Sequence, residues 1–597
     1  MQLKKTKLAG IISLLLCSNA MAVEISDPPI ARPTDGRFGP FVSAMDTSSA
    51  ATATTSTAIY TNTFAQSFTY DIGAPWTYNE YCQYDDDVCE LLWEGTKNGD
   101  GSDGLNVWRR NILNTFGGYN GTYKSETETS VDDIVISIPS DLSESRKITA
   151  IISTDQAGYA TDSGRKIVRR GFYNDVELIP SDINNGGFSS AHDFADVALT
   201  SSDGHNYEFA TKRLIVGQSS VQWSNADDNS RFTYCFNYPI DDDRYDYDDL
   251  YNCPGFDLQA SFWTVNGANV DTVAYLTGKN NWLNTGSDAT FIANAYAINE
   301  SGFAVGFSTQ QIYSSTSGGR ARATIFKPTV VATNTLSYTM SEITKPKTDV
   351  GSDYDDVIRD TVAIDITDKV YVSANVPFEA ADGTDNVSQA FIVVGNRTFE
   401  AVKNRSRVTD FYTYDVASGA VRYPFNANPI KGATSQVNKI NNDGLIVGWR
   451  DARGETSPRE DGSARFQSAF IYDYKTQKSA YLDDLYCKEV IDPNGSISGE
   501  IRYRFANAIS ISDPDSNGDV VVVSNALDYK NVENYKNRRG SNPVVLTMTI
   551  TKDDLDHLST TSQCPIKADE NYKRNGAGMG WFILLPTMML LFRRFKR

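Results

Sequence analysis

The chain has 597 residues, with 75 acidic against 55 Lys and Arg side chains and a formal net charge of −20. A surface this acidic repels nucleic acid and anionic lipid, which argues against DNA, RNA or peripheral membrane binding. The same charge keeps a protein soluble, so by itself it predicts no cationic partner. The length is several times that of one hydrophobic core and indicates several units.

The N-terminus has the three parts of a secretory signal. Three lysines are followed by the apolar run 8–17, and small residues precede a predicted cleavage by signal peptidase between Ala22 and Val23. Cys17 raises the alternative of a lipoprotein signal, but a bulky residue stands before it where a small one is expected. We therefore expect a signal peptide over 1–22 and an exported protein.

Two segments precede the body of the chain. Residues 23–58 end in a stretch rich in Ser, Thr and Ala, and we expect this segment to be flexible because such a composition buries little apolar surface. Residues 59–133 are rich in aromatic and acidic side chains. They are expected to form a cap or an incomplete unit of the following repeats.

The body of the chain repeats itself. Residues 295–306 align without gaps on 437–448, and a third copy with a longer turn spans 508–524. Each copy predicts a hairpin, in which a β-prone run enters an Asn/Asp-x-x-Gly turn and a β-branched run returns. The glycine of the returning run allows a close backbone approach. Weaker copies are Ala198–Leu199 with Ile215–Gly217, Ile364–Ser373, and Ala150–Ile152 with Gly158–Ala160.

A third strand with a small residue followed by aromatics comes after each hairpin, and these aromatics are expected to pack between neighbouring sheets. A fourth β-like run follows it, as at Ser479–Leu482. Four strands per unit predict an all-β fold, a β-propeller of about six to seven four-stranded blades over 134–570. Six units fall between about Ile134 and Ile550, and a seventh could come from the N-terminal region; an open β-solenoid is the rival fold. The third strands are expected at Ser261–Trp263, Thr324–Phe326, Ala390–Ile392 and Ala469–Ile471.

Six cysteines remain once the signal peptide is removed, an even number that suits an oxidising compartment. Six cysteines allow 15 connectivities, and their spacing does not indicate a zinc site. Proximity in sequence suggests pairing Cys82 with Cys89, Cys235 with Cys253, and Cys487 with Cys564.

The C-terminal segment 575–597 joins a glycine-rich stretch to a short apolar run and a basic end. The apolar run is shorter than the roughly 20 residues of a stable span and contains Pro586. It is expected to insert as a short transmembrane helix with the basic end in the cytoplasm. A plain inner-membrane anchor is the alternative to a segment that a protease processes.

Both features together resemble a known family. The pattern Ala-x-x-Ile-Asn-x-x-Gly-x-x-Val-Gly resembles the HAF-type extracellular repeat, and the tail resembles the GlyGly-CTERM sorting signal. An uncharacterised gammaproteobacterial family of unknown function combines the two. The resemblance implies cleavage by a rhomboid-type protease (rhombosortase) near Gly576, Ala577 and Gly578. It also implies type II secretion to the outer surface or release after transient anchoring, and it supplies no catalytic residues.

A search for catalytic chemistry finds no clear signature. The three histidines are His192, His205 and His557; none lies in a recognisable triad, and neither a Gly-x-Ser-x-Gly elbow nor a nucleotide-binding loop is present. The first two flank one repeat and are expected in turns. The acidic run Asp241–Asp249 is either a solvated loop or a ligand-binding one.

One short run has the start of a calcium loop. Asp513, Asp515, Asn517 and Asp519 place oxygen ligands at alternate positions, with a glycine for the sharp turn. Ser524 stands where the closing Glu is expected, so the run forms either a calcium site or an Asx-rich turn of the repeat. Calcium is therefore the cofactor that the sequence suggests.

The sequence leads us to expect a cell-surface or secreted propeller that acts as a non-catalytic binding module. Its extracellular ligand is unidentified, with carbohydrate as one class. A secreted hydrolase that acts on polysaccharide through paired carboxylates is the alternative, and a structural surface-coat protein is a third. Buried carboxylates that converge in the central channel would favour the hydrolase, whereas a coat protein would have no pocket.

Overall fold

The computed structural model describes the strands, the short helices and most of the tight turns of the chain. The described residues are 24–25, 38–46, 53–58, 147–161, 169–178, 189–201, 207–223, 256–266, 269–278, 292–310, 320–343, 358–368, 370–373, 387–403, 406–425, 434–452, 467–490, 501–537, 540–560 and 564.

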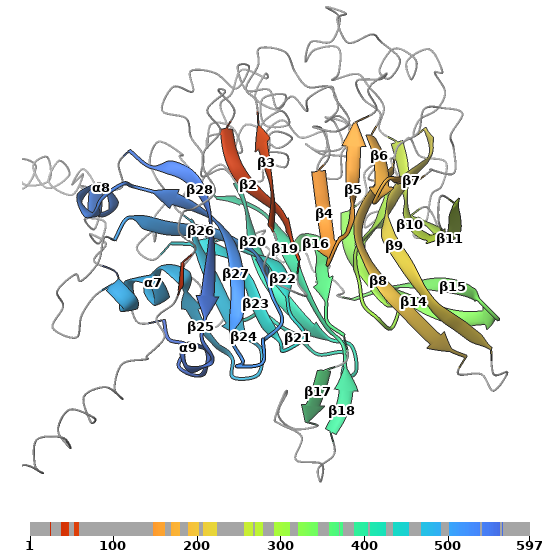
Figure 1. Ribbon diagram of the computed structural model, residues 1–597. Coiled ribbons are helices and arrows are strands. Elements are labelled where there is room, and N and C mark those ends of the chain that lie inside the picture. The colour runs from red at the N-terminus through yellow and green to blue at the C-terminus, as the bar shows by residue number, and fades with distance from the viewer. Residues whose placement is uncertain are drawn as a thin grey trace, which may run out of the picture.

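Six four-stranded antiparallel sheets form the blades of a propeller (Figure 1). Blade 1 contains β4 (Lys147–Ile152), β5 (Asp155–Thr161), β6 (Arg169–Tyr173) and β7 (Val176–Leu178). Blade 2 contains β8 (Ser189–Thr200), β9 (Glu208–Trp223), β10 (Phe256–Asn266) and β11 (Asn269–Thr277). Blade 3 contains β12 (Ala293–Ile298), β13 (Ala304–Gln310), β14 (Arg320–Ala332) and β15 (Thr335–Glu342).

The second half of the ring continues the same order. Blade 4 contains β16 (Ile358–Ile366), β19 (Ile392–Lys403), β20 (Ser406–Asp415) and β21 (Val421–Arg422). Blade 5 contains β22 (Ser435–Ile440), β23 (Leu445–Asp451), β24 (Gln467–Asp473) and β25 (Lys478–Tyr481). Blade 6 contains β26 (Tyr503–Ile511), β27 (Val520–Asp528), β28 (Asn542–Ile550) and β1 (Glu24–Ile25). Short helices α7 (Leu482–Val490), α8 (Val532–Asn537) and α9 (Lys552–Asp556) follow strands of the last two blades.

The N-terminal segment closes the ring. Strand β1 pairs antiparallel with β28, with Glu24 opposite Thr549 and Ile25 opposite Met548. The hairpin of β2 (Phe38–Met45) and β3 (Ala53–Ala58) lies between blade 6 and blade 1 and packs on β28 and β4 (Figure 1). The N-terminal region thus supplies a closing strand and a two-stranded hairpin between the first and last blades.

The expectation that residues 23–58 are flexible is therefore wrong for the residues that form β1, β2 and β3. Strand β3 has the sequence ATTSTA, and threonine is well suited to strands despite its polarity. Composition alone missed this because the hairpin is held by neighbouring blades: the Val42 N–H donates to Asn525 Oδ1 in blade 6 at 2.9 Å.

Aromatic side chains pack between blades, as the third-strand pattern predicts. Phe262 of blade 2 stacks on Tyr338 of blade 3 with ring centroids 4.1 Å apart, and its edge meets Phe326. Both Phe262 and Phe326 are fully buried. Burial of side chains this large accounts for much of the cohesion between blades.

The hairpin turns also confirm the repeat pattern. Gly302 and Gly444 have φ of 73° and 86°, which favours glycine. Gly306 and Gly448 in the returning strands face backbone of the inner strand. A Cβ on them would lie 1.9 Å and 2.0 Å from the nearest backbone carbonyl oxygen, so glycine is required there.

Blade 4 departs from the predicted strand order. Residues Ile364–Ser373 were expected to form the hairpin, with Ala390–Ile392 starting the third strand. Instead β16 pairs with β19, and β17 (Val370–Ser373) and β18 (Val387–Ala390) form a separate hairpin between them. Strand β17 contains valines, like the returning strands of the other blades, and its sequence was therefore assigned to the hairpin of blade 4.

Several expectations from the sequence concern residues outside the described ones. These are the signal peptide with Ala22 and Val23, the acidic run Asp241–Asp249, and the tail with Gly576, Ala577 and Gly578. Cys82, Cys89, Cys235 and Cys253 also lie outside. The structure joins Cys487 to Cys564, with Cα atoms 5.0 Å apart. Across the described residues, no helix is long and apolar enough to cross a membrane.

Candidate functional site

The innermost strand of every blade carries a β-bulge at the same place. The extra residue re-aims the side chains beside it toward the axis of the ring. The bulged residues are Thr149, His192, Tyr296, Ile364, Asn438 and Ile509, and the residues that follow them are Ala150, Asp193, Ala297, Asp365, Lys439 and Ser510. Repetition of one local distortion around the ring therefore builds a single central site.

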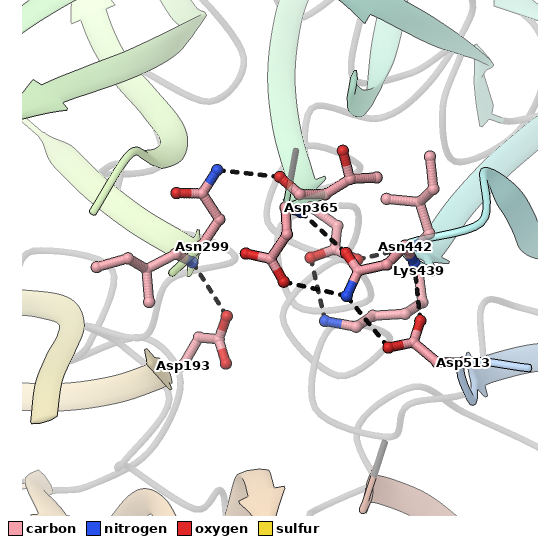
Figure 2. Close-up of polar contacts among 10 residues, drawn as sticks. Asp193, Asn299, Asp365, Lys439, Asn442 and Asp513 are labelled. Atoms are coloured by element: carbon pink, nitrogen blue, oxygen red, sulfur yellow. Dashed lines mark hydrogen bonds and ion pairs between the residues drawn. The ribbon is translucent and has the colours of Figure 1, made fainter. Parts of the chain in front are cut away.

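These residues line a cavity of about 530 Å³ in the central channel. All six inner strands contribute to its wall, together with Ala44 and Met45 of β2. A volume of this size is typical of a small-molecule site. The wall is polar on the side of blades 2, 4 and 5 because Asp193, Asp365 and Lys439 stand there (Figure 2).

Asp365 and Lys439 form an ion pair across neighbouring blades. The Lys439 Nζ lies 3.0 Å from Asp365 Oδ1, and the other carboxylate oxygen of Asp365 accepts the Ile440 N–H at 2.9 Å. Burial raises the pKa of the Asp365 carboxyl, which Lys439 partly offsets. Burial lowers the pKa of Lys439, but Asp365 and then Asp193 outweigh that effect, and its net pKa lies above the ordinary value. Lys439 is therefore a stable ammonium cation inside the channel.

Asp193 links blades 2 and 3 in the way that Asp365 links blades 4 and 5. Its Oδ2 accepts the Ile298 N–H of blade 3 at 3.0 Å. Burial raises the pKa of Asp193 to about 6, the attraction of Lys439 opposes this, and Asp365 raises it further. The channel thus holds two enclosed carboxylates and one ammonium group (Figure 2).

Two aromatic rings stand beside Asp193. The rings of His192 and Tyr296 have centroids 5.3 Å apart, and both residues line the cavity. Tyr296 in turn contacts Phe307. The bulges at His192 and Tyr296 thus place two aromatic rings in the same cavity wall as the Asp193 carboxylate.

One end of the cavity has a polar rim that links blade to blade. The N–H of Glu300 donates to Asp368, that of Asp368 to Asn442, and that of Asn442 to Asp513, at 2.8 to 2.9 Å. The Asn442 amide also donates to both carboxylates. Asp368, burial and Asp196 raise the pKa of Glu300. This rim is acidic, so the potential at that end of the cavity favours positive charge.

The residues of the expected calcium loop bind different partners. Asp515 accepts the N–H groups of Asn517 and Asp519, which makes it an Asx turn. Asp519 accepts the Lys552 N–H at 2.9 Å, whereas Asp513 belongs to the channel rim. No group of three or more His, Cys, Asp or Glu side chains within the described ranges could hold a metal ion.

The histidines fall in three different settings. His192 lies in strand β8, half-buried in the channel wall, and not in a turn as expected. His557 ends α9 at the surface, and His205 lies outside the described residues.

The sequence did not point to Asp193, Asp365 and Lys439 as site residues. The repeat pattern aligned the inner strand of blade 2 on Ala198–Leu199, whereas the structure aligns Phe194 with Ile298. With the inner strands aligned as in the structure, all three charged residues fall in one column, directly before an apolar residue of the repeat. That column is the signal that would have found the site.

Comparisons with known proteins add a family but no activity. The search of curated proteins found no match. Among solved structures, the chain matches an oligogalacturonate lyase in complex with manganese at 11% identity, covering 66% of this chain and 74% of that one, with a TM-score of 0.23. A likeness this loose carries no argument about function. A family described as "Protein of unknown function (DUF3466)" matches residues 125–595, and the chain belongs to that family.

Proposed function

We propose that the protein is an exported β-propeller of the cell envelope that binds a small ligand in its central channel and has no catalytic activity of its own. The observation that carries this proposal is the cavity of about 530 Å³, which is lined by side chains from every inner strand. A propeller has a central channel by construction, so what supports ligand binding is that the charged side chains Asp193, Asp365 and Lys439 line this one. A polar cavity of this size also counts against a purely structural coat protein.

The channel carboxylates are held in place by neighbouring blades, as recognition of a ligand requires. Asp193 and Asp365 each accept a backbone N–H of the next blade, and Asp365 also pairs with Lys439. Such bonds fix the carboxylates in place, which suits recognition because little side-chain freedom is lost on binding.

Plugging the channel tests this proposal. Ala150→Phe and Ser510→Phe each place a ring in the cavity from opposite sides of the closing hairpin. A screen of sugars, amino acids and amines by thermal shift should find ligands that raise the melting temperature of the wild type but of neither plugged variant. Val331→Phe, at a position 48% exposed on blade 3, is the matched control and should respond like the wild type. Ligands that bind all four proteins equally would place recognition outside the channel.

Localisation is part of the proposal and has its own test. The intact mass and location of the native protein should be measured with and without the rhomboid-type protease. A mature form that starts at Val23, ends near Gly576–Gly578 and lies at the surface supports sorting. A full-length C-terminus retained in the inner membrane contradicts it.

One observation favours a second candidate, the carboxylate-based hydrolase. Asp193 faces the cavity, and its pKa near 6 suits a general acid at neutral pH. In that case the wild type should release reducing ends from a polysaccharide panel, and Asp193→Asn should lower the rate at least 100-fold. No release from any polysaccharide, together with ligand binding that the plugs abolish, would decide for the binding module.

A further inference from the structure

The residue directly after the bulge of the inner strand can be compared between two pairs of neighbouring blades. Directly after the bulge, blades 4 and 5 carry Asp365 and Lys439, whereas blades 2 and 3 carry Asp193 and Ala297. In both pairs the aspartate accepts the backbone N–H that follows the second position: Ile440 at 2.9 Å and Ile298 at 3.0 Å. The two carboxylates are therefore held in the same way.

The pairs differ in what neutralises the carboxylate. Asp365 has the Lys439 ammonium at 3.0 Å. Asp193 forms no ion pair with any described residue, and the side chain that would correspond to Lys439 is the methyl group of Ala297. Asp193 and Ala297 both line the cavity, although Ala297 itself is buried.

The surroundings of Asp193 suit a cation. His192 and Tyr296 line the cavity next to it, and an aromatic face attracts a nearby cation electrostatically. Asp196, Glu300, Asp368 and Asp513 line the same cavity, and of these Asp196 is already paired with Arg213. One ammonium from Lys439 is shared by two enclosed carboxylates, so the site retains negative charge.

We propose that Asp193, at the part of the cavity that Ala297 also lines, binds the primary ammonium group of a small organic ligand in the way that Asp365 binds Lys439. The inference rests on the proposed function, since it assigns a ligand class to the same channel. Lys439 acts as an internal copy of the ligand group: at blades 4 and 5, the same residue position accommodates an alkylammonium chain beside an aspartate held in the same way.

The chemistry of the site separates an ammonium from a metal ion. Calcium takes six to eight oxygen ligands, and no three acidic, His or Cys side chains gather around a metal position in the described part of the chain. An ammonium donates three hydrogen bonds, so one carboxylate and neighbouring polar or aromatic groups are enough.

The test uses n-propylammonium chloride as the probe, against sodium chloride at the same ionic strength and 1-propanol as the neutral counterpart. Calorimetric titration and melting of the purified full chain should show binding of propylammonium only. Asp193→Asn keeps the shape and the acceptor for Ile298 and should weaken binding at least 10-fold. Asp553→Asn, which removes a carboxylate 83% exposed on α9, is the charge-matched control and should bind like the wild type.

A second pair of variants tests whether a lysine at position 297 can take the place of the ligand, as Lys439 does beside Asp365. Ala297→Lys should supply the missing ammonium, melt higher than Ala297→Met, and no longer respond to propylammonium. Ala297→Met has a similar length without charge and should lose the response without the gain in melting temperature. Equal binding by wild type and Asp193→Asn would overturn the inference.

The inference and the proposed function can fail separately. If propylammonium does not bind but another ligand does, and the Ala150→Phe plug abolishes that binding, the ammonium site is wrong and the binding channel stands. If no ligand depends on the channel, both are wrong.

Discussion

At the residue scale, Asp193 keeps a charge that the folded protein disfavours. Its pKa of about 6 in the folded state lies above the ordinary value of 3.8. The folded state therefore binds the proton more tightly than the unfolded state, and this contribution to stability is present at low pH and lost as the pH rises through 6. A group that costs stability at neutral pH and sits in a cavity is a candidate for function.

Asp193→Asn should remove this cost. The amide oxygen still accepts the Ile298 N–H, but no charge is buried. At pH 8 the free energy of unfolding should rise by roughly 3 kcal/mol, because the pKa moves from 3.8 to about 6 and one pKa unit corresponds to about 1.4 kcal/mol; at pH 4 it should barely change. Denaturant titrations at both pH values measure this. Asp365→Asn is the control, and it should be destabilised at pH 8 because it leaves Lys439 without its contact partner.

Gly306 gives a second prediction at this scale. Gly306→Ala places a methyl group against the carbonyl oxygen of Asn294, so the bulge of blade 3 must shift. The free energy of unfolding should fall by roughly 4 kcal/mol. Gly419→Ala is the comparison, since it has open space but a φ of 72° and should cost only about 1 kcal/mol. Equal losses would show that the close approach is unimportant.

At the element scale, the asparagine of the repeat ties the turns of blades 3 and 5 to the next blade. Asn441 is buried; its oxygen accepts the N–H groups of Asp443 and Leu445, and its amide donates to the Ser512 carbonyl of blade 6 at 2.8 Å. Asn299 does the same toward Thr367. The repeated motif therefore specifies the contact between blades as well as the hairpin.

Asn441→Ala should cost about 3 kcal/mol, because it removes three hydrogen bonds and leaves buried backbone groups without partners. Thermal and denaturant unfolding of the variant measure the loss. Asn517→Ala changes the exposed turn of blade 6, where the amide only reaches Asp515, and should cost less than about 1 kcal/mol. If the two variants match, the asparagine acts within its own turn alone.

Much of this element-level structure was predictable. Gly302, Gly306 and the aromatic third strands have local causes that the sequence displays. The insertion β17–β18 and the hairpin β2–β3 were not predictable from the sequence, because their positions depend on partners far away in the chain. The charged residues of the channel were missed for the same reason: Asp193, Asp365 and Lys439 come to line one cavity only after the blades are arranged in a ring.

At the scale of the whole molecule, the Cys487–Cys564 disulfide joins α7 to the segment after blade 6 across a sequence separation of 77. A crosslink over a loop of this length should stabilise the protein by about 4.5 kcal/mol in the chain-entropy model. Cys487→Ala with Cys564→Ala should lower the free energy of unfolding by that amount under oxidising conditions. Under strong reductant, the variant and the wild type should unfold at nearly the same denaturant concentration. A difference that persists in reductant would point to packing of the buried Cys487 as the cause.

The closing strand has a consequence for biogenesis. Glu24 pairs with Thr549, so a strand made at the start of synthesis waits for a partner made near its end. Until β28 is synthesised, β1 has no strand to pair with. Once β28 has formed, its outer edge is open to pairing with another chain until β1 pairs with it. Contacts this distant in sequence form slowly. The edge of β28 is therefore the part of the nascent propeller most open to aggregation until the two ends of the chain meet.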